Sequence, residues 1–156
     1  MSSSMEQRYR VLVLCTGNSA RSQMAEGLIN AQLADRFMAY SAGTQPTGRV
    51  HPEAIAALRE TGLDISQQRS KSVEEFIGYQ FDLAITVCDQ AAENCPVWLG
   101  HGQKVHIGFP DPVAAPPDQQ AQQFRTVRDA IQTELIGFLR QWRPAAQGPV
   151  SEEKNE

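Results

Sequence analysis

Short, almost continuous runs of apolar residues alternate along this chain with longer segments in which apolar residues recur every three or four positions. Continuous runs are typical of buried strands, and the longer spacing is typical of helices. The apolar runs predict four strands, at residues 10–15, 37–42, 81–88 and 104–107. The periodic segments predict helices at residues 19–34, 52–62 and 118–142, with a short helix at residues 72–77.

Two of these helices carry end signals. Ser19 is a residue type that caps a helix with its side-chain oxygen, so we expect it to begin the first helix. Pro52 suits the first turn of the second helix, and Gly62 is expected to end that helix.

The order of these elements predicts an α/β fold. Strands that alternate with helices form a parallel sheet, so we expect one domain with an open parallel four-stranded sheet flanked by helices on both faces. Its folded body is expected to span residues 8–143, between a flexible N-terminus at 1–7 and a flexible tail at 144–156. Ligands of such folds bind beyond the carboxyl ends of the strands. Cys15 and Cys88 each close a predicted strand, so both thiols could reach one crevice.

Composition and charge narrow the function classes. Of the 156 residues, 41% are hydrophobic and 21% are charged, as in ordinary soluble globular proteins. No apolar run is long enough to span a membrane, and the N-terminus has no signal-peptide pattern, so a cytoplasmic protein is expected. The net charge of −4 argues against a nucleic-acid or membrane partner. We expect a monomer. The odd count of three cysteines favours thiol or metal chemistry over a structural disulfide framework.

The strongest local pattern is Cys-x5-Arg-Ser, from Cys15 to Ser22, between the first strand and the first helix. Backbone N–H groups of such a loop and the positive end of the helix form an anion-binding cradle. Both the helix and Arg21 would stabilise a Cys15 thiolate, while Arg21 would also clamp an oxyanion and Ser22 would donate to the thiolate. Asn18 tolerates the left-handed backbone that such loops need. The residues expected to bind the oxyanion are Thr16, Gly17, Asn18, Ser19, Ala20 and Arg21. The alternative is a buried, unreactive cysteine at a strand end.

A cysteine nucleophile needs a proton donor for its leaving group. Asp111, in Phe-Pro-Asp-Pro at residues 109–112, follows the fourth predicted strand and is the candidate. The alternative is that Asp111 only stabilises a turn.

Cys88 and Cys95 are seven positions apart. If the segment between them is a short helix, both sulfurs lie on one face about 10 Å apart, so a disulfide would need a local conformational change. Two alternatives are that both thiols are simply buried, or that they bind zinc with His101 and His106, although zinc-binding cysteines usually lie closer in sequence. We expect no metal and no cofactor.

Five segments together resemble the thioredoxin-coupled arsenate reductases, which share the fold of low-molecular-weight protein tyrosine phosphatases. The resemblance covers residues 10–142, and the Cys-x5-Arg-Ser loop and Asp-Pro are common to both families. The segments are C-T-G-N-S-A-R-S-Q-M-A-E-G at 15–27, V-H-P-E-A at 50–54, G-L-D-I-S at 62–66, V-C-D-Q-A-A-E-N-C-P at 87–96 and F-P-D-P at 109–112.

This resemblance implies a three-thiol relay. Cys15 would attack arsenate in the loop while Asp111 protonates the departing oxygen. Cys88 would then attack Cys15 and release arsenite, and Cys95 would attack Cys88. Thioredoxin would reduce the resulting Cys88–Cys95 disulfide. Phosphate and sulfate would compete with arsenate for the loop.

Two departures from the family pattern matter. Some members have a further cysteine where this chain has Ala20, and the relay does not need it. Some bind potassium near the loop through an Asn, a Glu, a Ser and an Asp; Asn18, Glu26 and Ser41 match, but Lys71 stands at the Asp position. If the Lys71 ammonium takes the place of the cation, the protein should not depend on potassium. The alternative is that Lys71 is an exposed residue at a helix start.

Other functions remain open from the sequence. A low-molecular-weight tyrosine phosphatase would use Cys15, Arg21 and Asp111 through a Cys15 phospho-enzyme, with the other cysteines as spectators. Against it, Val113-Ala-Ala follows Asp111 where aromatic residues would line a tyrosine slot. A non-enzymatic oxyanion sensor that switches through Cys88 and Cys95 is a third reading. Reduction by a glutaredoxin or a low-molecular-weight thiol is an alternative to thioredoxin.

Overall fold

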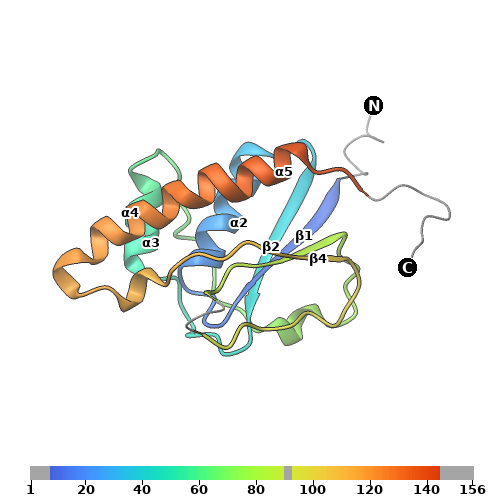
Figure 1. Cartoon of the computed structure of the whole chain (residues 1–156), viewed down its shortest axis with the longest axis horizontal. Helices are drawn as coiled ribbons and strands as arrows, with labels where there is room; N and C mark the ends of the chain where they lie inside the picture. The colour runs from blue at the N-terminus through green and yellow to red at the C-terminus, as the bar shows by residue number, and fades with distance from the viewer. Residues whose placement is uncertain (1–7, 90–92, 145–156) are drawn as a thin grey trace.

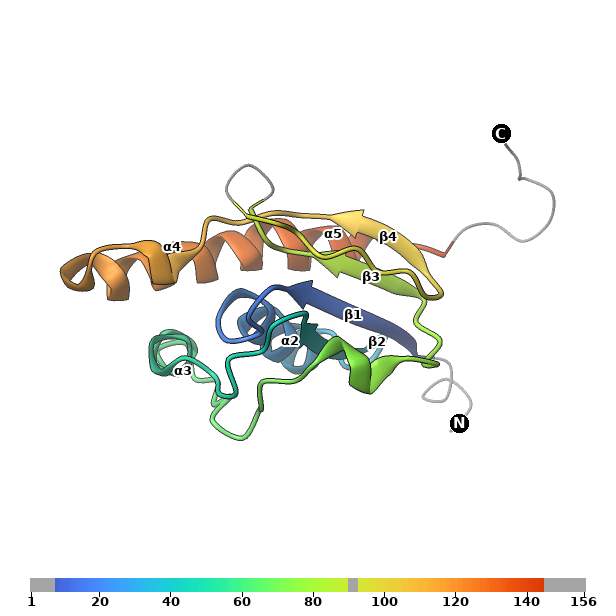
Figure 2. The same cartoon turned by 90° about the horizontal axis from the view of Figure 1, so that it is seen from below.

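A computed structural model describes residues 8–89 and 93–144 of the chain. Its centre is a four-stranded sheet made of β1 (Tyr9–Cys15), β2 (Phe37–Gly43), β3 (Leu83–Thr86) and β4 (Gln103–His106). The strand order is β2-β1-β3-β4 and every pair is parallel, which confirms the predicted single-domain α/β sheet (Figure 1; all four strands are labelled in Figure 2). The order reverses between β1 and β3, so the carboxyl ends of these two strands mark the expected ligand site.

The longer helices pack on one face of the sheet. They are α2 (Arg21–Gln32), α3 (Pro52–Arg59), α4 (Gln120–Ala130) and α5 (Gly137–Gln141), and a π-helical stretch, Ile131–Ile136, joins the last two into one rod (Figure 2). The opposite face is covered by a 3-10 helix, Val73–Phe76, and by loops. Helical segments therefore flank both faces, but among the described residues the second face has one short helical turn.

The residues of β1 explain why its sequence is continuously apolar. Val11 and Val13 point into a core formed with α2, α4 and α5, whereas Leu12 and Leu14 point to the other face, where Phe76, Phe81 and Trp98 pack. The side chains from Val11 to Leu14 are completely buried. A central parallel strand with both faces covered has no polar positions to alternate with apolar ones.

Several predicted boundaries differ from the observed ones. The first helix begins at Arg21 after Ala20, with no side-chain cap, so the prediction that Ser19 caps it is wrong. The strand predicted over residues 81–88 is shorter in the structure and spans Leu83–Thr86. Phe81, which precedes this strand, packs with Phe76 and Trp98 on the second face of the sheet. The short helix expected at residues 72–77 is the 3-10 turn capped by Ser72. Pro52 stands in the first turn of α3 as predicted.

Of the two predicted flexible ends, residues 1–7 and 145–156 lie outside the described residues. Across the described ranges, no helix has both the length and the apolar character needed to cross a membrane.

Candidate active site

The loop of residues 16–20 connects the end of β1 to the start of α2 and is held by its carbonyl groups. The Thr16, Gly17 and Ser19 oxygens accept hydrogen bonds from backbone N–H groups of residues 45, 47 and 51. The Asn18 oxygen accepts from the Gln23 side chain, and the Ala20 oxygen accepts from the N–H of residue 24. Within the described part of the chain, the N–H groups of residues 16–20 donate to no protein group. The loop thus has its acceptors satisfied and its donors available, as an anion cradle requires.

Two backbone features allow this loop conformation. Asn18 has a φ of 48°, in the left-handed region, as its side-chain type predicts. Gly43, at the end of β2, passes so close to the loop that an added Cβ would clash with the carbonyl oxygen of Thr16. A glycine at that position is therefore needed to bring the neighbouring strand against the loop.

Cys15 lies at the base of the loop as a free, buried thiol. Its Sγ is 3.0 Å from the Oγ of Ser22. The Asn18 side-chain amide donates to that same Oγ at 2.8 Å, which leaves the Ser22 hydroxyl hydrogen free to donate to the sulfur. Once Cys15 is a thiolate, Ser22 can only be the donor in this contact.

Arg21, in the first turn of α2, extends its guanidinium to the same site and is 5% exposed. Its Nη1 donates to the Phe109 carbonyl oxygen at 3.1 Å. Its Nη1 and Nη2 also pair with the two carboxylate oxygens of Glu93, at 2.5 and 2.8 Å. Burial lowers the pKa of Arg21, but the hydrogen bond to Glu93 and nearby negative charges outweigh burial, so the pKa is raised overall. Arg21 therefore stays fully charged.

Asp111 lies opposite, with its Oδ1 3.9 Å from Nη2 of Arg21. The same oxygen accepts from the N–H of Val113 at 3.0 Å and so caps the 3-10 turn Pro112–Ala114. The side chain is partly exposed and lines the cavity. The sequence left open whether Asp111 stabilises a turn or lies beside the loop. In the structure Asp111 does both.

These groups surround an open cavity of about 540 Å³. Its wall contains Cys15, all of the loop, Arg21 and Asp111, together with residues that the sequence did not single out. Those are Thr44, Gln45, Thr47, Glu93 and Asn94; Val113, noted in the sequence after Asp111, also lines the cavity.

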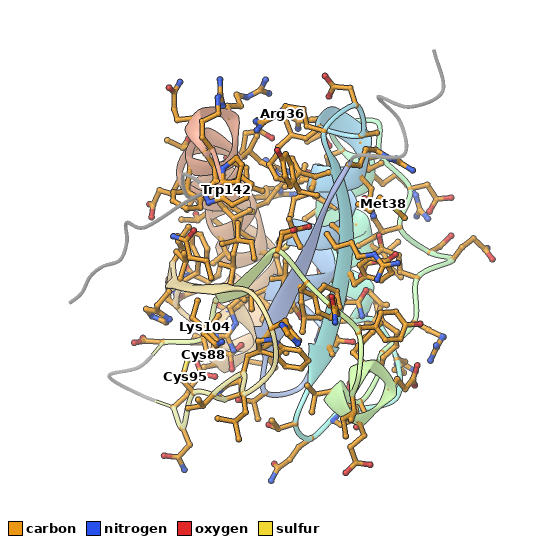
Figure 3. The ribbon with its side chains drawn as sticks, turned by 90° about the vertical axis from the view of Figure 1, so that its right-hand side faces the viewer. Arg36, Met38, Cys88, Cys95, Lys104 and Trp142 are labelled. Atoms are coloured by element: carbon orange, nitrogen blue, oxygen red, sulfur yellow. A yellow bond between two sulfur atoms is a disulfide. The ribbon has the colours of Figure 1, made fainter. Side chains whose placement is uncertain are left out.

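Cys88 and Cys95 are joined by a disulfide, with their Cα atoms 5.7 Å apart (Figure 3). The separation of about 10 Å that a regular helix would impose is therefore not present here. Residues 90–92 of this segment lie outside the described residues. Cys88 is completely buried and Cys95 is half-buried.

This disulfide also contradicts the zinc alternative, because both sulfurs are bonded to each other. His106, one of the two histidines proposed for that site, pairs through Nδ1 with the Thr86 hydroxyl at 2.8 Å. Among the described residues, no group of three or more His, Cys, Asp or Glu side chains is arranged to bind a metal.

Lys71 is buried, so the reading of an exposed helix-start residue is wrong. Its Nζ lies 2.9 Å from the Arg69 carbonyl oxygen, 3.3 Å from the Ser41 Oγ and 3.5 Å from Oε1 of Glu26. The Asn18 side-chain amide donates to the Ser41 Oγ at 3.0 Å. The ammonium therefore lies among the three side chains that the resemblance associates with a potassium ion.

Sequence reasoning missed Glu93 and Gln23. Glu93 lies between Cys88, which was predicted to reach the crevice, and Cys95. A carboxylate in this segment could have been recognised as a partner for the arginine of an anion site. Gln23 is completely buried and donates to both oxygens of Asn18 and to the Arg69 carbonyl oxygen. Its position just after Ser22 gave no separate signal.

Comparison with known proteins places this geometry in a family. The family model for low molecular weight phosphotyrosine protein phosphatase matches residues 10–147. An arsenate reductase of Bacillus licheniformis is 43% identical over 130 residues, which cover 82% of this chain and 93% of that protein. Arsenate reductase 2 of Staphylococcus epidermidis is 41% identical over 128 residues, covering 82% and 94%. A solved structure of an arsenate reductase in the phosphate-binding state superposes with a TM-score of 0.69 at 32% identity, over 85% of this chain and 97% of that one.

The chain belongs to the low-molecular-weight phosphotyrosine protein phosphatase family. Within that family, the relatives named above are arsenate reductases.

Proposed function

We propose that this protein reduces arsenate to arsenite with Cys15 as the nucleophile and Cys88 and Cys95 as the thiols that carry the oxidation away. The observation that carries the proposal is that a phosphatase-type loop with a free cysteine lies beside a second pair of cysteines, joined as the Cys88–Cys95 disulfide. Glu93 and Asn94, which precede Cys95, line the same cavity as the loop. A phosphatase needs only the first of these features. The identity of about 41–43% to arsenate reductases over most of the chain supports the same choice.

Arsenate is tetrahedral and anionic, which suits the donors of the loop. The N–H groups of residues 16–20, which donate to no group that the structure describes, and the guanidinium of Arg21 would bind its oxygens. The Cys15 thiolate would lie below the arsenic atom. Ser22 would stabilise this thiolate through the 3.0 Å contact. Thr16, Gly17, Asn18, Ser19 and Ala20 would form the cradle.

The first chemical step forms an S–As bond. The Cys15 thiolate attacks As(V), an As–O bond breaks, and Asp111 supplies the proton with which the departing oxygen leaves as water. Cys88 then attacks the Cys15 sulfur. The S–As bond breaks with its electron pair on arsenic, which leaves as arsenite, and a Cys15–Cys88 disulfide forms.

The last internal step frees the nucleophile. Cys95 attacks Cys88 and displaces the Cys15 thiolate, so that the two electrons given to arsenic come from Cys88 and Cys95. The arrangement with Cys15 free and Cys88 bonded to Cys95 corresponds to the end of this sequence. Thioredoxin is the proposed reductant, because a dithiol protein can open such a disulfide by exchange, and the reducing cytoplasm is the proposed location.

A second activity is compatible with the same site. Cys15, Arg21 and Asp111 suffice to hydrolyse a phosphate monoester, so we expect slow cleavage of small aryl phosphates. Val113, rather than an aromatic side chain, lines the cavity next to Asp111, which argues against phosphotyrosine as the main substrate.

The test is arsenate-dependent NADPH oxidation in the presence of thioredoxin and thioredoxin reductase. C15S should be inactive, whereas C95S should release about one equivalent of arsenite and then stop. Aryl-phosphate hydrolysis serves as the control for an intact loop, and C88S and C95S should keep it. Normal cycling by C95S would exclude the three-thiol relay, and retained phosphatase activity with no arsenate reduction in the wild type would favour the alternative.

A further inference from the structure

Glu93 binds the guanidinium of Arg21, the group that an oxyanion in the loop must also bind. Both of its carboxylate oxygens pair with the two terminal nitrogens of Arg21, at 2.5 and 2.8 Å. This two-point geometry is the one by which a guanidinium holds phosphate or arsenate. A carboxylate already bonded in this way must leave before an oxyanion can take the same donors.

The carboxylate is held from its own segment as well. Its Oε2 accepts from the Asp89 N–H at 2.9 Å, and the Glu93 N–H donates to the Asp89 carbonyl oxygen at 2.8 Å. The Glu93 side chain is 19% exposed and that of Arg21 is 6% exposed. In this partly desolvated setting a charged pair competes more strongly than it would on an open surface.

Charge repulsion opposes simultaneous binding of the Glu93 carboxylate and an oxyanion to Arg21. The cavity already contains Asp111, 3.9 Å from Arg21. The hydrogen bond from Arg21 lowers the pKa of Glu93 below its ordinary value of 4.5, with burial opposing it, so the side chain is a carboxylate at neutral pH. A tetrahedral dianion entering the loop would therefore be repelled by Glu93 as well as by Asp111, since both carboxylates lie beside Arg21.

The disulfide closes the segment that contains Glu93. Glu93 lies two residues before Cys95, and the Cys88–Cys95 bond closes the segment with its Cα atoms 5.7 Å apart. The neighbouring Asn94 carbonyl oxygen accepts from the Thr16 hydroxyl at 3.5 Å, a second contact between this segment and the loop. The disulfide is thus a covalent cross-link, in addition to the main chain, in the segment that contacts the loop.

We propose that Glu93 is a built-in competitor for the oxyanion, and that it acts when Cys88 and Cys95 are oxidised. This inference rests on the proposed function, because it assumes that the loop binds oxyanions and that the disulfide forms during turnover. The oxidised protein would bind phosphate or arsenate more weakly than the reduced protein. The enzyme would then take up its next substrate only after its thiols have been restored.

Linkage requires the reverse effect as well. If oxidation weakens oxyanion binding, then a bound oxyanion must favour the reduced form by the same factor. A tenfold difference in affinity corresponds to about 30 mV in the midpoint potential of this two-electron couple. Phosphate should therefore shift the Cys88–Cys95 couple to a more positive potential.

The experiment measures the dissociation constant of inorganic phosphate by calorimetry at pH 7, on the full chain with Cys88 and Cys95 either oxidised or reduced. In the wild type we expect the oxidised form to bind roughly tenfold more weakly, as loss of a charged hydrogen-bonding partner implies. E93Q keeps the shape and removes the charge, and E93A removes the whole carboxyl group. Both should bring the oxidised form to within about threefold of the reduced form. E134Q removes the same charge from an exposed helical position and should behave as the wild type.

Each outcome decides between the two proposals. Equal phosphate affinity of both redox forms of the wild type would overturn the role of Glu93 and leave the proposed function standing. Equal tightening of both forms by E93Q and E93A would overturn the link to the disulfide. If neither redox form bound phosphate, oxyanion binding by the loop would fail, and the proposed function would fail with it. A redox titration with and without phosphate gives a second measure, in which E93Q should lose the shift that the wild type shows.

Discussion

Replacing Lys71 by alanine tests whether a side chain has taken the place of a cation beneath the loop. The substitution removes three contacts of Nζ, with the Arg69 carbonyl oxygen, Ser41 and Glu26. It also leaves the carboxylate of Glu26, whose side chain is only 16% exposed, without its positive partner. The protein therefore loses an ion pair and keeps a nearly buried charge.

The magnitude follows from this burial. Breaking one side of a fully buried ion pair costs about 3–5 kcal/mol, and the residual exposure of Glu26 reduces this to about 2–3 kcal/mol. For a domain of this size, that loss corresponds to a fall in Tm of roughly 4–12 °C. K104A is the matched control, because Lys104 is an exposed lysine whose Nζ, within residues 8–89 and 93–144, bonds to no group other than the carbonyl oxygens of Gly100 and Gly102. We expect K104A to lose less than about 0.5 kcal/mol.

Thermal unfolding in potassium and in sodium chloride at equal ionic strength provides the decisive measurement. The wild type should have the same Tm in both salts, because the ammonium fills the site. K71A should have a higher Tm in potassium than in sodium. The difference in Tm should be larger for K71D, because its new carboxylate would join Glu26, Ser41 and Asn18 as a fourth possible cation ligand. A potassium-dependent rise in the Tm of the wild type, or a loss in K71A no larger than in K104A, would refute the reasoning.

Three further predictions concern the loop and its partners. G43A should lower the free energy of unfolding by about 2 kcal/mol or more and weaken phosphate binding, because its Cβ would displace the Thr16 carbonyl; denaturant titration that finds G43A as stable as the wild type contradicts the close approach. D111N should lower aryl-phosphate hydrolysis by about 10²–10⁴-fold while phosphate affinity stays within a few fold, since it removes a proton donor and not an anion ligand; equal activity would assign Asp111 to the turn alone. The pKa of Glu93 is lowered in the folded state, so its stabilising effect is fully present above its unfolded value of about 4.5 and is lost as the pH falls through the lowered folded value. The difference in unfolding free energy between wild type and E93Q should accordingly shrink on acidification below pH 4.5, and a difference that stays constant would show that the ion pair contributes nothing.

The sequence predicted those features that depend on local pattern. The four strands, their parallel arrangement and the loop after the first strand follow from apolar runs and from one dense motif, and they agree with the structure. Asn18 in a left-handed conformation follows from its side-chain type. Each of these features needs information from only a few neighbouring residues.

The remaining features depend on residues that are distant in sequence. Ser19 does not cap α2, because the helix begins one residue later, with Ala20 as its N-cap, and backbone N–H groups of residues 45, 47 and 51 hold the loop through its carbonyl oxygens. The distance between Cys88 and Cys95 is set by a covalent bond whose formation depends on redox state, which helix propensity does not predict. Glu93 pairs with Arg21, which is 72 positions away in the sequence, and local spacing does not predict such a long-range contact. The location of the Lys71 ammonium beside Glu26 and Ser41 was predicted from the family resemblance and not from local sequence pattern.

The outward bonding of the loop carbonyls has a consequence for hydrogen exchange. The N–H groups of Gln45, Thr47 and His51 hold these carbonyls whether or not an anion is present, so they should exchange slowly in both states. The N–H groups of residues 16–20 have no acceptor within the described part of the chain, and they should exchange rapidly until an oxyanion supplies one. Binding of phosphate should therefore protect one side of the loop backbone and leave the other side unchanged. Such a one-sided footprint distinguishes an anion received by a rigid cradle from an anion that folds the loop around itself.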